Sequence, residues 1–298
     1  MSVFVMARAT SKNRFKNLIG VLLAPIAFYM LFRWFEHTQV YQPFTRLEAN
    51  GDVLGRPFED VYFQDRPKLN GWFFPANTNS PRAHLAVLIC HGNAGNISHR
   101  LDLYKLLLAM GVNVFAFDYR GYGRSEGKPS EAGTYQDAQS AHSWLLARGF
   151  AGTNIIALGE SLGGGVASEL ALRQPLGGLV LQSAFTSILD IGTELFPWLP
   201  VRIIATIKYD TRSKLPEIKV PVLVIHGPSD SVIPFHHAER NFAAANEPKL
   251  FWKLEGDHND PVTNERENYL KGFERFLAMV EHRQPENTRG AGQSDSRD

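Results

Sequence analysis

Cysteine is almost missing from this chain of 298 residues, in which Cys90 is the only one. No intramolecular disulfide can form, and zinc sites built from several cysteines are excluded. The chain also has almost no net charge, because 31 basic residues stand against 30 acidic ones. The overall charge therefore gives no reason to expect a nucleic acid as a partner. Nor does the sequence contain an internal repeat.

Long apolar runs are equally scarce, and the main one covers residues 18–35. It follows a tail, residues 1–17, that has four basic residues and no acid, and Arg33 is its one charged residue. These features predict an uncleaved transmembrane signal anchor, although a cleaved signal peptide, a helix lying in the membrane interface and a buried amphipathic arm also fit. Positive charge ahead of the anchor places the amino terminus in the cytoplasm and the remaining chain on the far side, periplasmic, lumenal or extracellular.

Hydrophobic residues make up 44% of the chain, which is enough to fill a large core. Two short apolar pieces, 61–63 and 71–74, predict antiparallel strands at a sheet edge. The following runs do not alternate in polarity, as is typical of parallel strands buried on both faces. These runs cover residues 85–90, 112–117, 155–158, 179–181, 222–225 and 250–254.

Helix-length segments between the apolar runs complete a doubly wound, mostly parallel α/β domain over residues 40–283. We expect these helices at residues 98–110, 131–148, 162–173, 235–245 and 264–280. The apolar segment 185–215 is longer than one crossover helix requires and predicts a small lid, although a crossover helix with a packed loop fits as well. Residues 284–298 are polar and predict a disordered tail.

The segment Gly159-Glu-Ser-Leu-Gly163 joins a predicted strand to a predicted helix. Such a turn lifts a serine hydroxyl clear of the backbone, and glycines beside it let the strand and the helix approach closely. Ser161 is therefore the candidate nucleophile. A serine hydroxyl is too weakly acidic to attack a carbonyl unaided, so it requires a base, and the base requires an acid.

Asp230 and His258 are the candidates for these two roles. Each follows a predicted strand, as Ser161 does, and the carboxyl ends of parallel strands share one edge of a sheet. The order serine, acid, histidine is the one found in α/β-hydrolases. No metal or organic cofactor is required for this chemistry. Asp257 and Asp260 flank the histidine, and an auxiliary role for either stays open.

Backbone N–H groups are expected to bind the oxyanion. Leu162, directly after the nucleophile, is one candidate donor, and Asn93, in the loop after residues 85–90, is the other. His91 is interpreted as a residue that orders this loop. For Glu160 two interpretations stay open, pairing with a substrate amine and a local hydrogen bond.

Four motifs together resemble the α/β-hydrolase superfamily, and more narrowly its membrane-anchored alpha/beta-hydrolase-domain proteins and their bacterial relatives. They are His91-Gly-Asn-Ala-Gly-Asn96, Asp118-Tyr-Arg-Gly-Tyr-Gly-Arg-Ser125, Gly159-Glu-Ser-Leu-Gly-Gly164 and His226-Gly-Pro-Ser-Asp230. The resemblance covers residues 55–280. It implies a catalytic triad of Ser161, Asp230 and His258, with oxyanion donors at Asn93 and Leu162.

The expected function is a serine hydrolase of the carboxylesterase or thioesterase type, acting on a small-molecule, acylated or lipid-like substrate. Glu160 motivates an alternative, an aminopeptidase-like amidase on the same fold. A membrane-tethered binding module without catalytic activity is a further alternative, because a fold alone does not establish activity.

Overall fold

The computed structural model describes residues 23–259 and 264–289, and side chains as far as residue 283. The chain divides into two compact units at the junction between Gln42 and Pro43. Each unit is described by itself.

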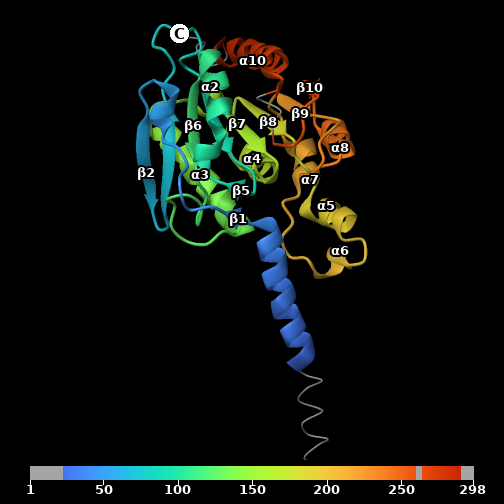
Figure 1. Cartoon of the computed structure of the whole chain (residues 1–298). Coiled ribbons are helices and arrows are strands. Elements are labelled where there is room, and N and C mark those ends of the chain that lie inside the picture. Colours follow the sequence, from blue (N-terminus) through green and yellow to red (C-terminus); the bar gives the residue numbers. More distant parts are fainter. Residues whose placement is uncertain (1–22, 260–263, 290–298) are drawn as a thin grey trace, which may run out of the picture. The chain divides into compact units, whose positions relative to one another are not determined.

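The second unit is built around an eight-stranded sheet with the order β10-β9-β8-β7-β4-β6-β3-β2 (Figure 1). All neighbours from β10 to β6 are parallel, whereas β3 is antiparallel to both β6 and β2. The strands are β2 (Glu59–Asp65), β3 (Lys68–Phe74), β4 (Ala86–Cys90), β6 (Asn113–Phe117), β7 (Ile155–Glu160), β8 (Gly178–Gln182), β9 (Val222–His226) and β10 (Lys249–Lys253). Two further strands, β1 (Gln42–Pro43) and β5 (Ala94–Gly95), have two residues each.

Helices cover both faces of the sheet. Val180 of β8 belongs to the core cluster that contains side chains of α2 and α10. The next residue, Leu181, points to the opposite face of the sheet, because successive side chains of a strand alternate. Its Cδ2 atom there lies 3.6 Å from where a Cβ at Gly164 of α4 would be. The helices are α2 (Leu101–Ala109), α3 (Glu131–Ala147), α4 (Leu162–Arg173), α5 (Ile188–Leu195), α6 (Val201–Ile204), α7 (Thr211–Lys214), α8 (His236–Ala244) and α10 (Arg266–Arg289). Short 3₁₀ turns are η1 (Gly51–Leu54), η2 (Ile97–Arg100), η3 (Gly152–Asn154) and η4 (Leu215–Glu217).

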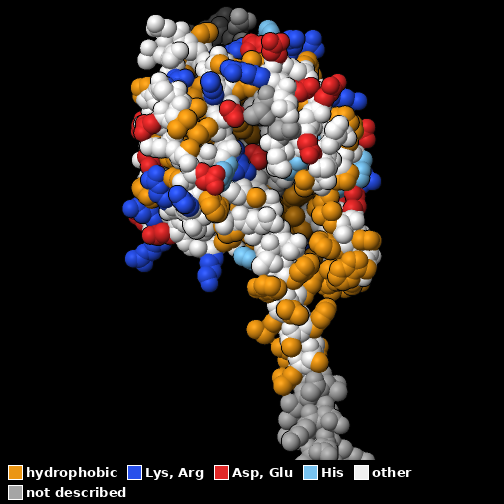
Figure 2. All heavy atoms as spheres, viewed as in Figure 1, with side chains coloured by type: hydrophobic (Ala, Val, Ile, Leu, Met, Phe, Trp, Pro, Cys, Tyr) orange, Lys and Arg blue, Asp and Glu red, His pale blue; other side chains and the backbone are white. Residues whose placement is uncertain are grey.

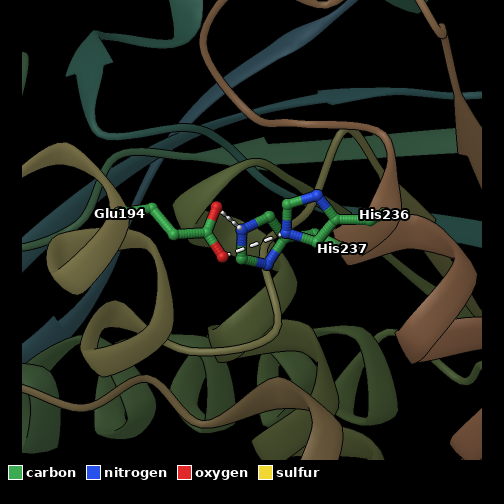
Figure 3. Close-up of side chains that lie close together, drawn as sticks. All are labelled: Glu194, His236 and His237. Atoms are coloured by element: carbon green, nitrogen blue, oxygen red, sulfur yellow. Dashed lines mark hydrogen bonds and ion pairs between the residues drawn. The ribbon is translucent and has the colours of Figure 1, made fainter.

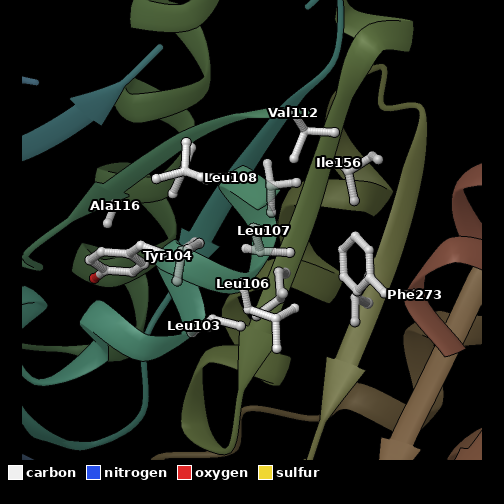
Figure 4. Packing of buried hydrophobic residues seen from close by; sticks show 14 of the residues in the cluster. Leu103, Tyr104, Leu106, Leu107, Leu108, Val112, Ala116, Ile156 and Phe273 are labelled. Carbon is white, nitrogen blue, oxygen red and sulfur yellow. The ribbon is translucent and has the colours of Figure 1, made fainter. Parts of the chain in front are cut away.

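A large core lies between the sheet and the pair α2 and α10 (Figure 4). Leu106 and Leu107 of α2, Ile156 of β7 and Phe273 of α10 are all buried in this cluster. Each such side chain stabilises the fold by about 1.5–3 kcal/mol relative to an exposed position. This packing holds β7 rigidly, and β7 is the strand that leads into the candidate nucleophile.

The predicted fold class is confirmed. Continuous apolar runs became the parallel strands, and β4, β6, β8 and β9 are buried throughout because helices cover both of their faces. The edge strand β10 is only half-buried. The pieces at 61–63 and 71–74 became the antiparallel pair β2 and β3. The helix predicted over 162–173 has these bounds in the structure. At residues 98–110 the chain instead starts with the 3₁₀ turn η2 and continues as α2.

The segment predicted as a lid over residues 185–215 contains three short helices, α5, α6 and α7, and not one crossover helix. Helix α7 packs against α4 and α8, and α5 and α6 pack against each other. Apolar side chains gather on the surface of α5 and α6 (Figure 2). Trp198 is 75% exposed and Ile203 is 84% exposed. Whether this segment moves as a lid stays a prediction.

The prediction of a transmembrane anchor over residues 18–35 is wrong for the residues that can be assessed. Residues 23–40 are helical, yet no helix in the described parts of the chain is both long and apolar enough to cross a membrane. The physical reason is polarity within this helix, where Arg33 pairs with Glu36 and the residues at 37–39 are polar. The predicted single-pass location, with the catalytic domain across a membrane, is corrected accordingly. Residues 18–22 lie outside the described chain.

Both predicted terminal tails fall largely outside the described residues. This holds for the whole basic tail, residues 1–17, and for residues 290–298 of the tail predicted to be disordered. Helix α10 continues to Arg289, past the predicted start of that tail at residue 284.

Candidate active site

Ser161 stands between the last residue of β7 and the first residue of α4. Its backbone has φ 52° and ψ −114°, a left-handed conformation that non-glycine residues rarely adopt. The neighbouring glycines leave no room for side chains. A Cβ at Gly163 would lie 1.9 Å from the Cys90 carbonyl oxygen, and one at Gly159 would lie 2.3 Å from the Gly163 carbonyl oxygen. The sequence thus forms the strained turn that the motif predicts.

The structure brings Ser161, His258 and Asp230 together. The Nε2 atom of His258 lies 3.2 Å from the Ser161 hydroxyl, and Nδ1 of the same ring lies 2.7 Å from Oδ2 of Asp230. These residues follow the ends of β7, β9 and β10, so the parallel sheet delivers all three to one edge. Such an arrangement can transfer a proton from a hydroxyl to an imidazole.

Several donors hold the Asp230 carboxylate in place. Its Oδ1 atom accepts hydrogen bonds from the N–H groups of Val232 and Ile233, at 2.9 and 2.7 Å. Nε2 of His226, at the end of β9, lies 3.2 Å from Oδ2. Burial alone would raise the pKa of Asp230, but hydrogen bonds from His226 and His258 outweigh it and hold this pKa well below its ordinary value. The carboxylate therefore stays ionised beside His258.

Asp257 has a positioning role in the histidine loop. Its Oδ1 accepts hydrogen bonds from the backbone N–H groups of Ser231 and His258, each at 2.7 Å, and Ser231 Oγ donates to it as well. One exposed carboxylate thereby connects the loop of the acid to the loop of the histidine. Asp260 lies outside the described residues.

The two predicted oxyanion donors lie on the elements expected for them. Leu162 is the first residue of α4, and the first N–H groups of a helix have no acceptor within it. Asn93 lies between β4 and β5, where its carbonyl accepts a hydrogen bond of 2.8 Å from the Tyr122 hydroxyl. Both N–H groups stay predicted oxyanion donors.

His91 and the loop after β6 support the backbone around Asn93. The buried ring of His91 packs on Tyr119 and Tyr122, with centroids 4.4 and 5.2 Å away, and its Nδ1 lies 2.7 Å from the Gly92 carbonyl. Tyr119 donates to the His91 carbonyl at 3.0 Å. These contacts agree with the interpretation of His91 as a residue that orders the loop.

Glu160 pairs with Arg100, a residue that the sequence alone did not single out. Oε1 of Glu160 lies 3.1 Å from Nη2 of Arg100, and Oε2 lies 3.3 Å from Nε. Burial alone would raise the pKa of Glu160, but the charge and hydrogen bonds of Arg100 outweigh it and lower this pKa. The carboxylate is therefore ionised and already neutralised by a partner within the protein.

A cavity of about 370 Å³ opens beside His258. Charged and polar side chains provide much of its wall, among them Arg100, Asp102, Glu160, Gln182 and Asn259. Sequence reasoning missed this cavity because its wall combines η2, α2 and the ends of β7, β8 and the histidine loop. The charged residues near positions 99–102 form no sequence motif that could have predicted the cavity.

Several known proteins and one family model are similar to this chain. A family model described as "Serine aminopeptidase, S33" matches residues 81–209. The protein named "Uncharacterized protein Rv2307c" of Mycobacterium tuberculosis is 42% identical over 233 residues, which cover 78% of this chain and 80% of that one. The "Alpha/beta hydrolase domain-containing protein WAV2" of Arabidopsis thaliana is 34% identical over 246 residues, or 74% of this chain and 78% of that protein.

A solved structure of the esterase Pf2001 from Pyrococcus furiosus has a similar fold. Its TM-score is 0.66 at 22% sequence identity, and the match covers 80% of this chain and 98% of that one. At this identity the likeness concerns the fold alone.

Proposed function

Because the chain belongs to the α/β-hydrolase superfamily, we propose that it is a serine hydrolase that cleaves an ester or thioester through an acyl-Ser161 intermediate. The observation that carries this proposal is the hydrogen-bonded series of Asp230, His258 and Ser161, with distances of 2.7 and 3.2 Å. An ionised carboxylate only accepts hydrogen bonds, so Nδ1 of His258 carries a proton toward Asp230. Nε2 then keeps the lone pair that can receive the serine proton.

In the first half of the reaction, Ser161 Oγ bonds to the substrate carbonyl carbon while its proton passes to His258 Nε2. The tetrahedral intermediate collapses, the bond to the alcohol or thiol breaks, and the imidazolium returns the proton to this leaving group. In the second half, water attacks the carbonyl carbon of the acyl-serine and gives a proton to Nε2. The bond between this carbon and Ser161 Oγ then breaks, and the imidazolium returns the proton to Oγ. The products are a carboxylic acid and free Ser161, so no external reactant besides water is needed.

The negative oxygen of each tetrahedral intermediate requires donors that are already in place. Under the proposal, the N–H groups of Leu162 and Asn93 supply them, and each such donor accounts for about 3 kcal/mol of transition-state stabilisation. Support for Leu162 comes from its position at the start of α4, where its N–H has no helical acceptor.

The cavity beside His258 favours a substrate with a polar group on one side of the scissile bond. The expectation of a lipid-like substrate rested on the anchor and on the apolar segment 185–215. The anchor has been corrected, so the exposed apolar residues of α5 and α6 are the remaining support for an acyl chain.

An aminopeptidase-like amidase is the second candidate, supported by the description of the matching family and by the place of Glu160 in the cavity wall. The ion pair with Arg100 weighs against it, because a substrate amine would have to compete with a guanidinium for this carboxylate. Turnover of aminoacyl amides without turnover of p-nitrophenyl acyl esters would favour the amidase.

A fluorophosphonate probe tests the proposed nucleophile. We expect one covalent label per wild-type chain and none on Ser161→Ala, since the probe requires an activated serine. Ser143→Ala is the matched control, because Ser143 is an exposed serine on α3 and its removal should leave labelling unchanged. An unlabelled wild type would favour a catalytically silent binding module, and a labelled Ser161→Ala would exclude this residue as the nucleophile.

A further inference from the structure

Three side chains of types that bind metal ions converge from two helices. Glu194 is the second-last residue of α5, and His236 and His237 are the first two residues of α8. Figure 3 shows the carboxylate of Glu194 facing both imidazoles. Oε1 lies 3.0 Å from Nε2 of His236, and Oε2 lies 3.3 Å from Nε2 of His237.

The separation of 3.3 Å already suits coordination of one ion, and the separation of 3.0 Å is a hydrogen bond that the ion would replace by lengthening it a little. Zn²⁺ binds imidazole nitrogen and carboxylate oxygen at about 2.0–2.2 Å, so two ligands in a tetrahedral shell lie roughly 3.3–3.5 Å apart. The potential ligand atoms of the three residues all lie within 4.8 Å of one another. Two nitrogens and one oxygen form a donor set that suits zinc and neighbouring transition metals, whereas Mg²⁺ and Ca²⁺ prefer oxygen alone.

His237 supplies the independent observation. Its side chain is completely buried, and its Nε2 faces Oε2 of Glu194 at 3.3 Å without the alignment of a good hydrogen bond to any residue that the structure describes. Buried polar nitrogens without a partner are rare and costly. A protonated imidazole would satisfy both groups as an ion pair, and a cation bound between Nε2 and the carboxylate would satisfy them equally.

The other nitrogen of His237 is held as in a metal-binding histidine. Nδ1 lies 2.8 Å from Oγ1 of Thr186, and this hydroxyl lies 2.7 Å from Oδ2 of Asp190. The Asp190 carboxylate only accepts, so the single hydroxyl hydrogen of Thr186 goes to it. Oγ1 of Thr186 then accepts a hydrogen bond from Nδ1–H of His237, and the lone pair of the ring is left on Nε2. The Thr186 N–H, 3.2 Å from Nδ1, is the competing contact, since it fits the opposite tautomer.

We propose that Glu194, His236 and His237 form a site for a divalent transition metal of the Zn²⁺ class. The ion would connect the end of α5 to the start of α8, and α8 begins six residues after Asp230. It would therefore fix the α5 and α6 segment to the helix that follows the acid loop. The site takes no part in the proposed hydrolysis and stands independently of it.

Metal binding is tested on the full chain, without a histidine tag and after chelator treatment, by equilibrium dialysis against Zn²⁺. We expect one Zn²⁺ per wild-type chain, a rise in Tm of about 5 °C at saturating metal, and no response to Mg²⁺. Co²⁺ should give the visible absorption of a four- or five-coordinate ion. Glu194→Gln and His236→Gln should each weaken binding at least tenfold.

Two control variants distinguish coordination from other effects. His84→Ala removes an exposed histidine elsewhere and should leave binding unchanged. Arg240→Gln removes a cation 3.9 Å from Glu194 and should retain or tighten binding, because a guanidinium competes with the metal for the carboxylate. Zinc binding that is equal in wild type and His236→Gln, or a loss in Arg240→Gln as large as in Glu194→Gln, would overturn the proposal.

Discussion

Ser161 occupies a backbone conformation that few serine residues adopt, and the structure around it makes this conformation unavoidable. Gly163 allows the first turn of α4 to lie directly against the Cys90 carbonyl at the end of β4. The strained residue costs on the order of 1–3 kcal/mol, which close packing on both sides must offset. The reactivity of Ser161 therefore depends on glycine at positions 159 and 163 as much as on the hydroxyl.

Gly163→Ala tests this dependence. The added Cβ would lie 1.9 Å from a backbone oxygen that cannot move without shifting β4. We expect a loss of about 2–3 kcal/mol in the free energy of unfolding, a fall in Tm of roughly 5–10 °C, and little fluorophosphonate labelling. Gly192→Ala in α5 is the control, because its Cβ would meet only the Val201 side chain, at 3.1 Å. Equal Tm values for the two variants would contradict the steric argument.

Asp230 has a lowered pKa, so its contribution to stability has a defined pH dependence. The stabilisation is complete above the ordinary carboxyl pKa near 4 and is lost as the pH falls toward the lowered pKa of the folded state. Asp230→Asn should be less stable than wild type by about 1.5–3 kcal/mol at neutral pH.

Urea unfolding of both proteins between pH 7 and pH 2.5 measures this effect. The difference in unfolding free energy should stay constant down to about pH 5 and shrink below pH 4. A difference that grows on acidification would contradict the sign of the pKa shift.

At the scale of elements, the ion pair of Arg100 and Glu160 joins η2 to the last residue of β7. Both side chains are largely buried, with exposed fractions of 11% and 21%. Breaking such a pair leaves one charge without a partner, which costs more than the pair itself contributes. This contact therefore fixes the cavity wall beside Ser161 relative to the sheet.

A double-mutant cycle measures this contact. Arg100→Gln should lower the unfolding free energy by about 3 kcal/mol, because Glu160 stays behind as an uncompensated charge. Arg100→Gln combined with Glu160→Gln should recover part of this loss. Additive effects of the two substitutions would show that the pair does not couple η2 to β7. Arg173→Gln, which breaks an exposed pair on α4, is the control and should cost below about 1 kcal/mol.

At the scale of the whole molecule, Cys90 reports on the integrity of the sheet. It ends β4, a central strand, and its side chain is fully buried. Burial raises the pKa of its thiol to about 12, although a hydrogen bond with Tyr119 lowers this pKa in part. The thiolate, which is the reactive form, is therefore nearly absent at neutral pH.

An aromatic disulfide reagent such as DTNB should leave the native protein unmodified and label one thiol per chain in guanidinium chloride. The native labelling rate should be at least about 100-fold lower, because reaction requires opening of the central sheet. Rapid native labelling would contradict the burial of Cys90.

Much of the fold followed from the sequence because its signals were local. Buried parallel strands appear as continuous apolar runs, and the elbow at Ser161 is a motif of five residues. Asp230 and His258 each follow a predicted strand, and the structure brings both together with Ser161.

Contacts between distant segments could not be predicted in this way. Arg100 lies 60 residues before Glu160, and Glu194 lies 42 residues before His236, so no local pattern marks either pair. The anchor prediction failed for a different reason. It considered the apolar run alone and gave too little weight to Arg33, Glu36 and the polar residues that follow in the same helix.

The order of its residues along the chain also determines when the proposed triad can form. His258 emerges from the ribosome 97 residues after Ser161, and the strand before it, β10, is the outermost member of the parallel part of the sheet. At typical rates of synthesis, a nascent chain carries the hydroxyl for about 5–20 s before its base is made. During that time the nascent chain has no base for the proposed triad and cannot carry out the proposed reaction.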